Sequence, residues 1–231
     1  MSNFARLLAL CCLLALALPA HAAALTERDA VISRQNDKIQ IRVHYPETGN
    51  AKVDADVAEW ARQLVDTFQT TYGEEPDLGV PYELESTYST THASPSVLSI
   101  IWKTASYTGG AHGNLEITCL NYDLLTGRRL DLADLFKDPE KALQLMSAWS
   151  QKELARSLGE DTDEDMIRDG VAPDLRNFAN LTLTPQGLRI EFQPYQVAPW
   201  AAGPQRVDMP LAELAAAGPE ARIWPQAPVA E

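Results

Sequence analysis

The 231-residue chain contains few of the residues that usually form catalytic and metal sites. It has three cysteines and four histidines, and no G-x-S-x-G, H-E-x-x-H or C-x-x-C sequence occurs in it. These absences exclude the common patterns of a hydrolase nucleophile and of a zinc centre. We therefore predict no catalytic residue, no metal site and no cofactor.

Basic residues are scarce as well. The chain has 19 lysines and arginines against 32 aspartates and glutamates, which gives a formal net charge of −13. Phosphate binding needs clustered lysine and arginine side chains, so nucleic acid is not an expected partner. The acidic balance favours a basic protein partner, although the solubility that a high net charge gives to an exported protein explains it more simply.

Long apolar runs are missing, and the main one, residues 7–18, is too short for a stable membrane span. It follows a charged start and ends at an A-H-A sequence, the pattern of a secretory signal peptide with its cleavage site. We predict that residues 1–22 are removed and that the mature protein is periplasmic or secreted, without membrane attachment. Cys11 and Cys12 suggest a lipoprotein as the alternative, but Leu10 is bulky where a small residue is expected.

Two further features have simple explanations that require no special chemistry. Cys119 would be the one cysteine left after cleavage, so an internal disulfide is excluded, and a small buried apolar side chain is its expected role. The acidic stretch 159–165 has the spacing of the first ligands of a calcium loop. However, Met166 stands where that loop needs glycine and Ala172 where it needs glutamate. The stretch is better explained as the start of a short helix.

The sequence is rich in strand and helix periodicity, which predicts an α+β fold. Residues 53–72 carry apolar side chains at helical spacing, and residues 139–158 form a second helical segment. We expect an antiparallel β-sheet, made of a meander and a C-terminal hairpin, with helices packed on one face. Residues 23–217 would form a single domain, followed by a loosely ordered tail at 218–231. The expected strands are 39–45, 82–91, 97–105, 114–123, 180–184, 187–192 and 206–209.

Two loops combine rigid backbone with aromatic side chains, and they are the candidate partner-binding site. The first loop, between two long strands, contains Tyr107, Gly109, Gly110 and His112. The second is stiffened by prolines and contains Tyr195 and Trp200. Such pre-shaped aromatic loops lose little entropy on binding. A structural role is the alternative for each of these residues, because the glycines can simply permit a turn and the aromatic rings can cover a sheet edge.

Three stretches of the sequence carry a family resemblance. They are YTGGAHGN, NYDLLTGRRLDLADLF and FQPYQVAPWAAGPQRVDMPLAEL. Together they resemble the extracytoplasmic RsiV-like domain family, over roughly residues 41–214. Members of that family form the outer part of a lysozyme-sensing anti-sigma factor, and others precede polysaccharide deacetylase domains. The resemblance implies an extracytoplasmic domain with a partner in the cell envelope.

These observations together favour a non-enzymatic, exported binding protein. Its expected partner is a basic protein such as a lysozyme, or a component of the cell wall such as peptidoglycan. Two alternatives remain open: a module that binds envelope glycans, and a hydrolase that acts on envelope sugars, since such a hydrolase needs only two carboxylates.

Overall fold

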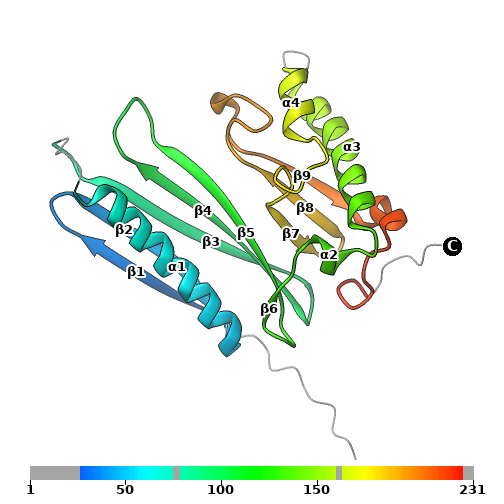
Figure 1. Ribbon diagram of the computed structural model, residues 1–231, viewed down its shortest axis with the longest axis horizontal. Helices are drawn as coiled ribbons and strands as arrows, with labels where there is room; N and C mark the ends of the chain where they lie inside the picture. Colours follow the sequence, from blue (N-terminus) through cyan, green and yellow to red (C-terminus); the bar gives the residue numbers. More distant parts are fainter. Residues whose placement is uncertain (1–26, 75–78, 160–162, 226–231) are drawn as a thin grey trace, which may run out of the picture.

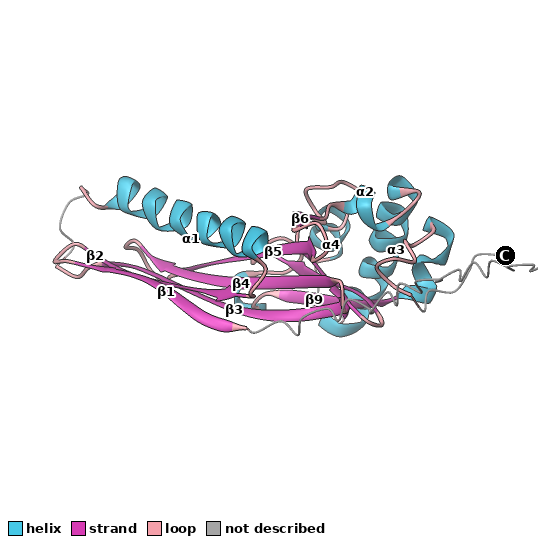
Figure 2. Ribbon diagram, turned by 90° about the horizontal axis from the view of Figure 1, so that it is seen from below, coloured by secondary structure: helices cyan, strands magenta, loops and turns pink. Residues whose placement is uncertain are grey.

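The computed structural model describes residues 27–74, 79–159 and 163–225 and shows two sheets with helices packed against them (Figures 1 and 2). The predicted signal peptide lies outside these residues. The strands are β1 (Arg28–Gln35), β2 (Ile39–Glu47), β3 (Tyr82–Ser94), β4 (Val97–Tyr107), β5 (Asn114–Asp123), β6 (Arg128–Arg129), β7 (Leu181–Thr184), β8 (Gly187–Phe192) and β9 (Gln205–Pro210). The helices are α1 (Ala51–Tyr72), α2 (Leu132–Leu135), α3 (Pro139–Leu158) and α4 (Glu164–Gly170), with 3₁₀ helices η1 (Trp200–Ala202) and η2 (Leu211–Ala217).

The larger sheet has six strands in the order of the sequence, β1 to β6. The predicted antiparallel meander is confirmed for β3, β4, β5 and β6. Strands β2 and β3 instead pair in parallel, because α1 carries the chain back to the same end of the sheet before β3 begins. Strand β1, whose polar sequence gave no strand signal, pairs antiparallel with β2 at the sheet edge.

Helix α1 covers one face of the larger sheet (Figure 2). The Asn50 side chain caps its start by accepting hydrogen bonds from the first-turn backbone. The apolar face of the helix buries Val53, Val57, Ala61, Val65 and Phe68. These side chains pack on alternating residues of the strands, and Trp102 at the centre of β4 is fully buried beneath them. The apolar residues found at helical spacing in the sequence therefore form the core-facing side of α1.

The smaller sheet consists of β7, β8 and β9, and it is covered by α3. The predicted hairpin of β7 and β8 is confirmed, and β9 adds a third antiparallel strand. Alternate residues of β7 and β8 point into the core, which also includes Phe136, Met146 and Trp224. This sheet has its own apolar core, separate from the one under α1.

A buried polar network joins the two sheets. The Ser99 hydroxyl on β4 donates to the Asn121 side chain on β5 at 2.5 Å and accepts from the backbone N–H of Leu183 on β7 at 2.8 Å. The Asn121 amide donates to the carbonyl of Leu181 at 3.0 Å. Because all of these groups are buried, their hydrogen bonds fix how β7 lies against the larger sheet.

The end of the chain departs from its prediction. Residues 218–225 were expected to be loosely ordered, but Ile223 and Trp224 are buried and the Trp224 indole donates to the carbonyl of Thr184 at 2.9 Å. The proline-rich composition suggested a loose tail. Burial of these two apolar side chains in the core beneath α3 stabilises an ordered conformation instead. The remaining residues, 226–231, lie outside the described part of the chain.

The network between the sheets generates the first prediction. Replacing Asn121 with alanine removes the partner of Ser99 and the donor to Leu181, and should lower the free energy of unfolding by about 2–3 kcal/mol. Asn114→Ala is the matched control, because Asn114 is exposed on the same strand, and its effect should stay within about 0.5 kcal/mol. Urea unfolding followed by fluorescence measures both. Equal effects of the two substitutions would show that the network does not hold the sheets together.

Candidate functional site

The tip of the β4–β5 hairpin is a glycine turn that carries His112. Gly109 and Gly110 have φ angles of 91° and 97°, which side chains other than glycine rarely adopt. The Tyr107 hydroxyl donates to the carbonyl of Gly110 at 3.3 Å, and His112 Nδ1 lies 2.7 Å from the carbonyl oxygen of Gly113. Tyr107 and the two glycines thus shape the turn, while the His112 ring is exposed on it.

The loop between β8 and β9 begins with a tight turn that holds a strained tyrosine. The Gln196 N–H donates to the carbonyl of Gln193 at 3.0 Å and closes the turn. Tyr195 is its third residue and has φ 67°, a conformation that turns normally give to glycine or asparagine. The Gln196 side chain anchors the turn by donating to the carbonyls of Gly170 and Asn177, both at 2.9 Å. The fold therefore holds Tyr195 in a costly conformation.

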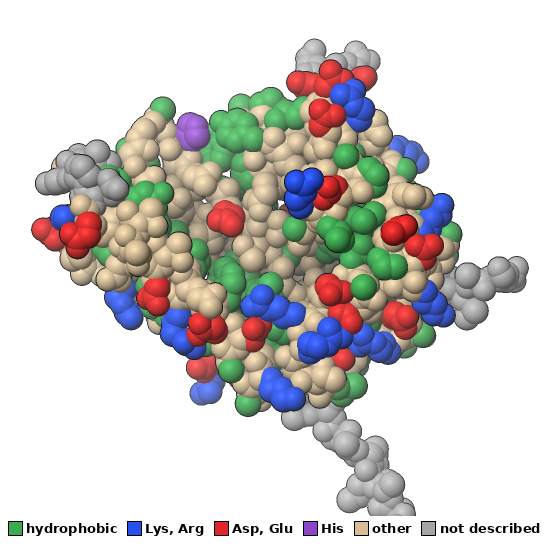
Figure 3. Space-filling model, viewed as in Figure 1, with side chains coloured by type: hydrophobic (Ala, Val, Ile, Leu, Met, Phe, Trp, Pro, Cys, Tyr) green, Lys and Arg blue, Asp and Glu red, His purple; other side chains and the backbone are tan. Residues whose placement is uncertain are grey.

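Three aromatic rings from the two loops meet at one surface. The His112 ring stacks on Trp200, with ring centroids 4.8 Å apart and 19° between the planes. Tyr195 lies 5.7 Å from Trp200 on a tilted plane, and 55% of its surface is exposed. We call His112, Tyr195 and Trp200 the aromatic cluster. Figure 3 shows a hydrophobic patch at this place, where the β8–β9 loop approaches the tip of the β4–β5 hairpin.

The structure thus places the six residues singled out in the sequence in two groups. Three of them form the aromatic cluster, although they are far apart in the chain. Tyr107, Gly109 and Gly110 lie below it and set the turn that presents His112. A partner-binding role for the six residues stays a prediction. Flat rings held by rigid loops offer an apolar surface with polar edges, which suits a ligand that has both kinds of surface.

A buried carboxylate, Glu191, was missed in the sequence because strand alternation placed it on the solvent side of a hairpin. Glu191 is only 6% exposed, because this side of β8 faces the larger sheet near Cys119. Burial raises the pKa of the Glu191 carboxyl, and the charges of Lys103, Arg189 and Arg206 partly oppose that rise. Burial also raises the pKa of the Cys119 thiol, so this cysteine stays protonated as expected of a small core residue.

His44 gives no sign of nucleophilic catalysis. His44 Nδ1 lies 2.9 Å from the Asp29 carboxylate, in a cavity that Ser89 and Tyr88 also line. Burial, followed by the charges of Asp29 and Glu27, raises the pKa of Tyr88 to about 12, so its hydroxyl is neutral. Within residues 27–74, 79–159 and 163–225 no hydrogen bond joins His44 to Ser89, so the contact between base and nucleophile is missing.

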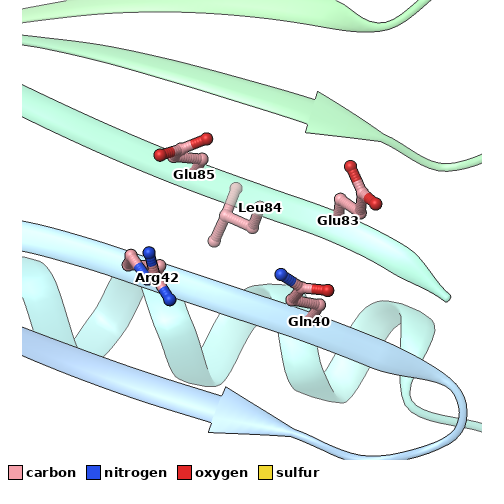
Figure 4. A pocket seen from close by; sticks show the side chains of 5 residues that line it. All are labelled: Gln40, Arg42, Glu83, Leu84 and Glu85. Atoms are coloured by element: carbon pink, nitrogen blue, oxygen red, sulfur yellow. The ribbon is translucent and has the colours of Figure 1, made fainter.

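The back of the larger sheet is polar at β2 and β3. Arg42 and Gln40 on β2 lie beside Glu83 and Glu85 on β3 and line a shallow pocket on the face opposite α1 (Figure 4). In the described residues no group of three histidine, cysteine or acidic side chains is placed to hold a metal ion. None of the helices in this part of the chain has the length and apolar character to cross a membrane.

Comparison with known proteins gives two family matches. Residues 32–115 match the family described as deacetylase PdaC, and residues 133–212 match a family described as a protein of unknown function, DUF3298. The chain is 28% identical over 167 residues to the peptidoglycan-N-acetylmuramic acid deacetylase PdaC of Bacillus subtilis. This alignment covers 71% of the chain but only 36% of the relative, so the chain spans about a third of that protein.

Two crystal structures of DUF3298 family proteins share the fold. One, from Pseudomonas aeruginosa, superimposes with a TM-score of 0.66 at 15% identity, and covers 87% of this chain and 96% of that one. The other, from Bacteroides fragilis, gives 0.58 at 16% identity, with 87% and 97% covered. The aromatic cluster takes His112 from the segment that matches PdaC and its other two rings from the segment that matches DUF3298.

The strained turn generates the second prediction. Tyr195→Gly and Tyr195→Ala both remove the ring, but only glycine adopts φ 67° without a steric cost. The glycine variant should therefore be more stable than the alanine variant by about 1 kcal/mol. Urea unfolding of the two proteins under the same conditions measures this difference. An alanine variant as stable as the glycine variant would mean that the backbone at this position carries no strain.

Proposed function

We propose that this chain is an exported, non-enzymatic protein of the cell envelope that binds the glycan of peptidoglycan through the aromatic cluster. The cluster itself is the observation that carries the proposal. Sugar rings present apolar C–H faces and polar rims, and exposed aromatic rings held in place offer the matching surface. The similarity to a deacetylase whose name specifies peptidoglycan supports the choice of ligand.

Binding without catalysis is favoured over the hydrolase alternative. The rings of the cluster are joined to one another by stacking, and His112 has its Nδ1 next to a backbone carbonyl rather than a nucleophile. The His44–Asp29 pair lacks a contact with a serine or threonine hydroxyl in the described residues. The chain corresponds to only 36% of the deacetylase relative, so the activity in that protein's name is not proposed for this chain.

The third prediction tests glycan binding directly. The exported protein should bind soluble oligosaccharides from peptidoglycan in calorimetry, and Trp200→Ala or His112→Ala should weaken that binding about tenfold. Leu125→Ala is the control, because Leu125 is 83% exposed but is not part of the cluster. Binding of a neutral N-acetylglucosamine oligomer should vary little with salt, since stacking on neutral sugars is not a charge interaction. Unchanged affinity in both aromatic variants would overturn the proposal.

A basic protein such as a lysozyme is the second candidate, as the RsiV-like resemblance suggests. The observation that favours it is the net charge of −13. An acidic protein attracts a basic partner over long distances, and salt weakens that attraction.

The fourth prediction separates this partner from the glycan. If a lysozyme is the partner, its association rate with the exported protein should fall by about tenfold or more between low and moderate salt. Surface plasmon resonance at several salt concentrations measures that rate, with an acidic protein of similar size as the control. The absence of saturable binding at low salt would remove the lysozyme candidate.

A further inference from the structure

Glu191 lacks a partner although it is almost fully buried. Its neighbours on β8, Ile190 and Phe192, point into the core of the smaller sheet, so Glu191 lies on the opposite side of that sheet. In the described part of the chain, its carboxylate makes no hydrogen bond or ion pair, and it is not among the unpartnered atoms that are fully enclosed. Solvent, or a ligand of matching shape, can therefore reach the carboxylate oxygens.

A second polar group without a partner lies on the same side of the smaller sheet. Thr182 on β7 is 2% exposed, and its hydroxyl oxygen has no hydrogen-bond partner. The strand register places Thr182 opposite Arg189, which makes it a diagonal neighbour of Glu191. Buried polar groups nearly always have partners, so two adjacent exceptions mark an interface with unsatisfied polar groups. The Thr182 hydroxyl is fully enclosed, so Glu191 is the one of the two that a ligand can reach.

Two exposed cationic side chains lie near Glu191. Arg189 pairs with Asp208, at 2.7 Å and 3.2 Å. Lys103 and Arg206 influence Glu191 electrostatically, but neither forms a hydrogen bond or ion pair within the described ranges. Both are exposed. Two cations without ion-pair partners in the described residues, in a chain with a net charge of −13, favour an anionic group next to Glu191.

The same strands lead from this place to the aromatic cluster. Lys103 shares one face of β4 with Tyr107, which supports the His112 turn. Glu191 comes four residues before Tyr195, and Arg206 is held just below η1 by its neighbour Gln205, which donates to the carbonyls of Ala202 and Gly203. Four residues span at most about 13 Å in an extended strand, and the turn closed by Gln193 and Gln196 makes the distance shorter. An oligosaccharide bound at the cluster can therefore reach this place.

We propose that Glu191, Lys103 and Arg206 form a second subsite, which accepts an N-acylated sugar that carries a carboxylate. The ligand carboxylate binds Lys103 and Arg206, and its amide N–H donates to Glu191. This inference rests on the proposed glycan binding and adds the sugar that is recognised: the aromatic cluster holds any sugar ring, whereas the second subsite selects the acidic one.

Two probes of equal length separate the inference from the function on which it rests. One is an oligomer of N-acetylglucosamine, and the other is a peptide-free peptidoglycan strand, in which alternate sugars carry a carboxylate. Calorimetry with the exported protein should show that the acidic strand binds about tenfold more tightly, the factor expected for a charged hydrogen-bonded contact. The double variant Lys103→Gln/Arg206→Gln should remove this preference and leave the binding of the neutral oligomer unchanged.

Two further variants complete the test. Glu191→Gln should weaken binding of the acidic strand about tenfold, while its melting temperature at neutral pH should be no lower than that of the unmodified protein, because no charge is then buried. Arg34→Gln is the control, an exposed arginine on β1. Equal binding of both probes, or a preference that survives the variants, would overturn the second subsite alone. Binding of neither probe would instead overturn the proposed function.

Discussion

The side chain of Gln193, at the end of the smaller sheet, joins it to the larger sheet by forming the hydrogen bonds to β5 that a neighbouring strand would form. Strand β6 pairs only with Tyr122 and Asp123, so the rest of the outer edge of β5 lacks a neighbouring strand. The Gln193 amide donates to the carbonyl of Ile117 at 2.6 Å and accepts from its N–H at 2.9 Å. Both backbone groups of an edge residue are thereby satisfied by one side chain.

The position of the candidate site depends on this contact. Gln193 is also the first residue of the turn that contains Tyr195. Its backbone N–H is held in place because it donates to the side-chain carbonyl of Gln196 at 3.0 Å. The turn is therefore fixed to β5 on one side and to α4 and its following loop on the other. Since β5 leads directly into the hairpin tip, the same contact sets the distance between Trp200 and His112. A loop ordered in this way loses little entropy when it binds.

Sequence patterns predicted those parts of the fold that local periodicity determines. The continuous apolar run of β4, the alternation of β5 and β8 and the apolar stripe of α1 gave the correct elements, because these patterns follow which faces of an element are buried. The parallel pairing of β2 and β3 depends on where α1 returns the chain, and the strand β1 carries mostly polar residues at an exposed edge. The stacking of His112 on Trp200 joins residues from different sheets, so no local pattern could reveal it.

Glu191 shows where strand alternation misleads. Its place opposite the core residues Ile190 and Phe192 indicated solvent, and in a single sheet that inference would hold. Here a second sheet lies over that side, and the position becomes a buried interface whose polar groups lack partners. This arrangement costs stability, but it places the aromatic cluster and the charged groups around Glu191 next to each other on the molecule. Exposed rings can hold a sugar by shape, and the charges beyond them can distinguish one sugar from another, because a buried polar group left unpaired by the wrong ligand is costly.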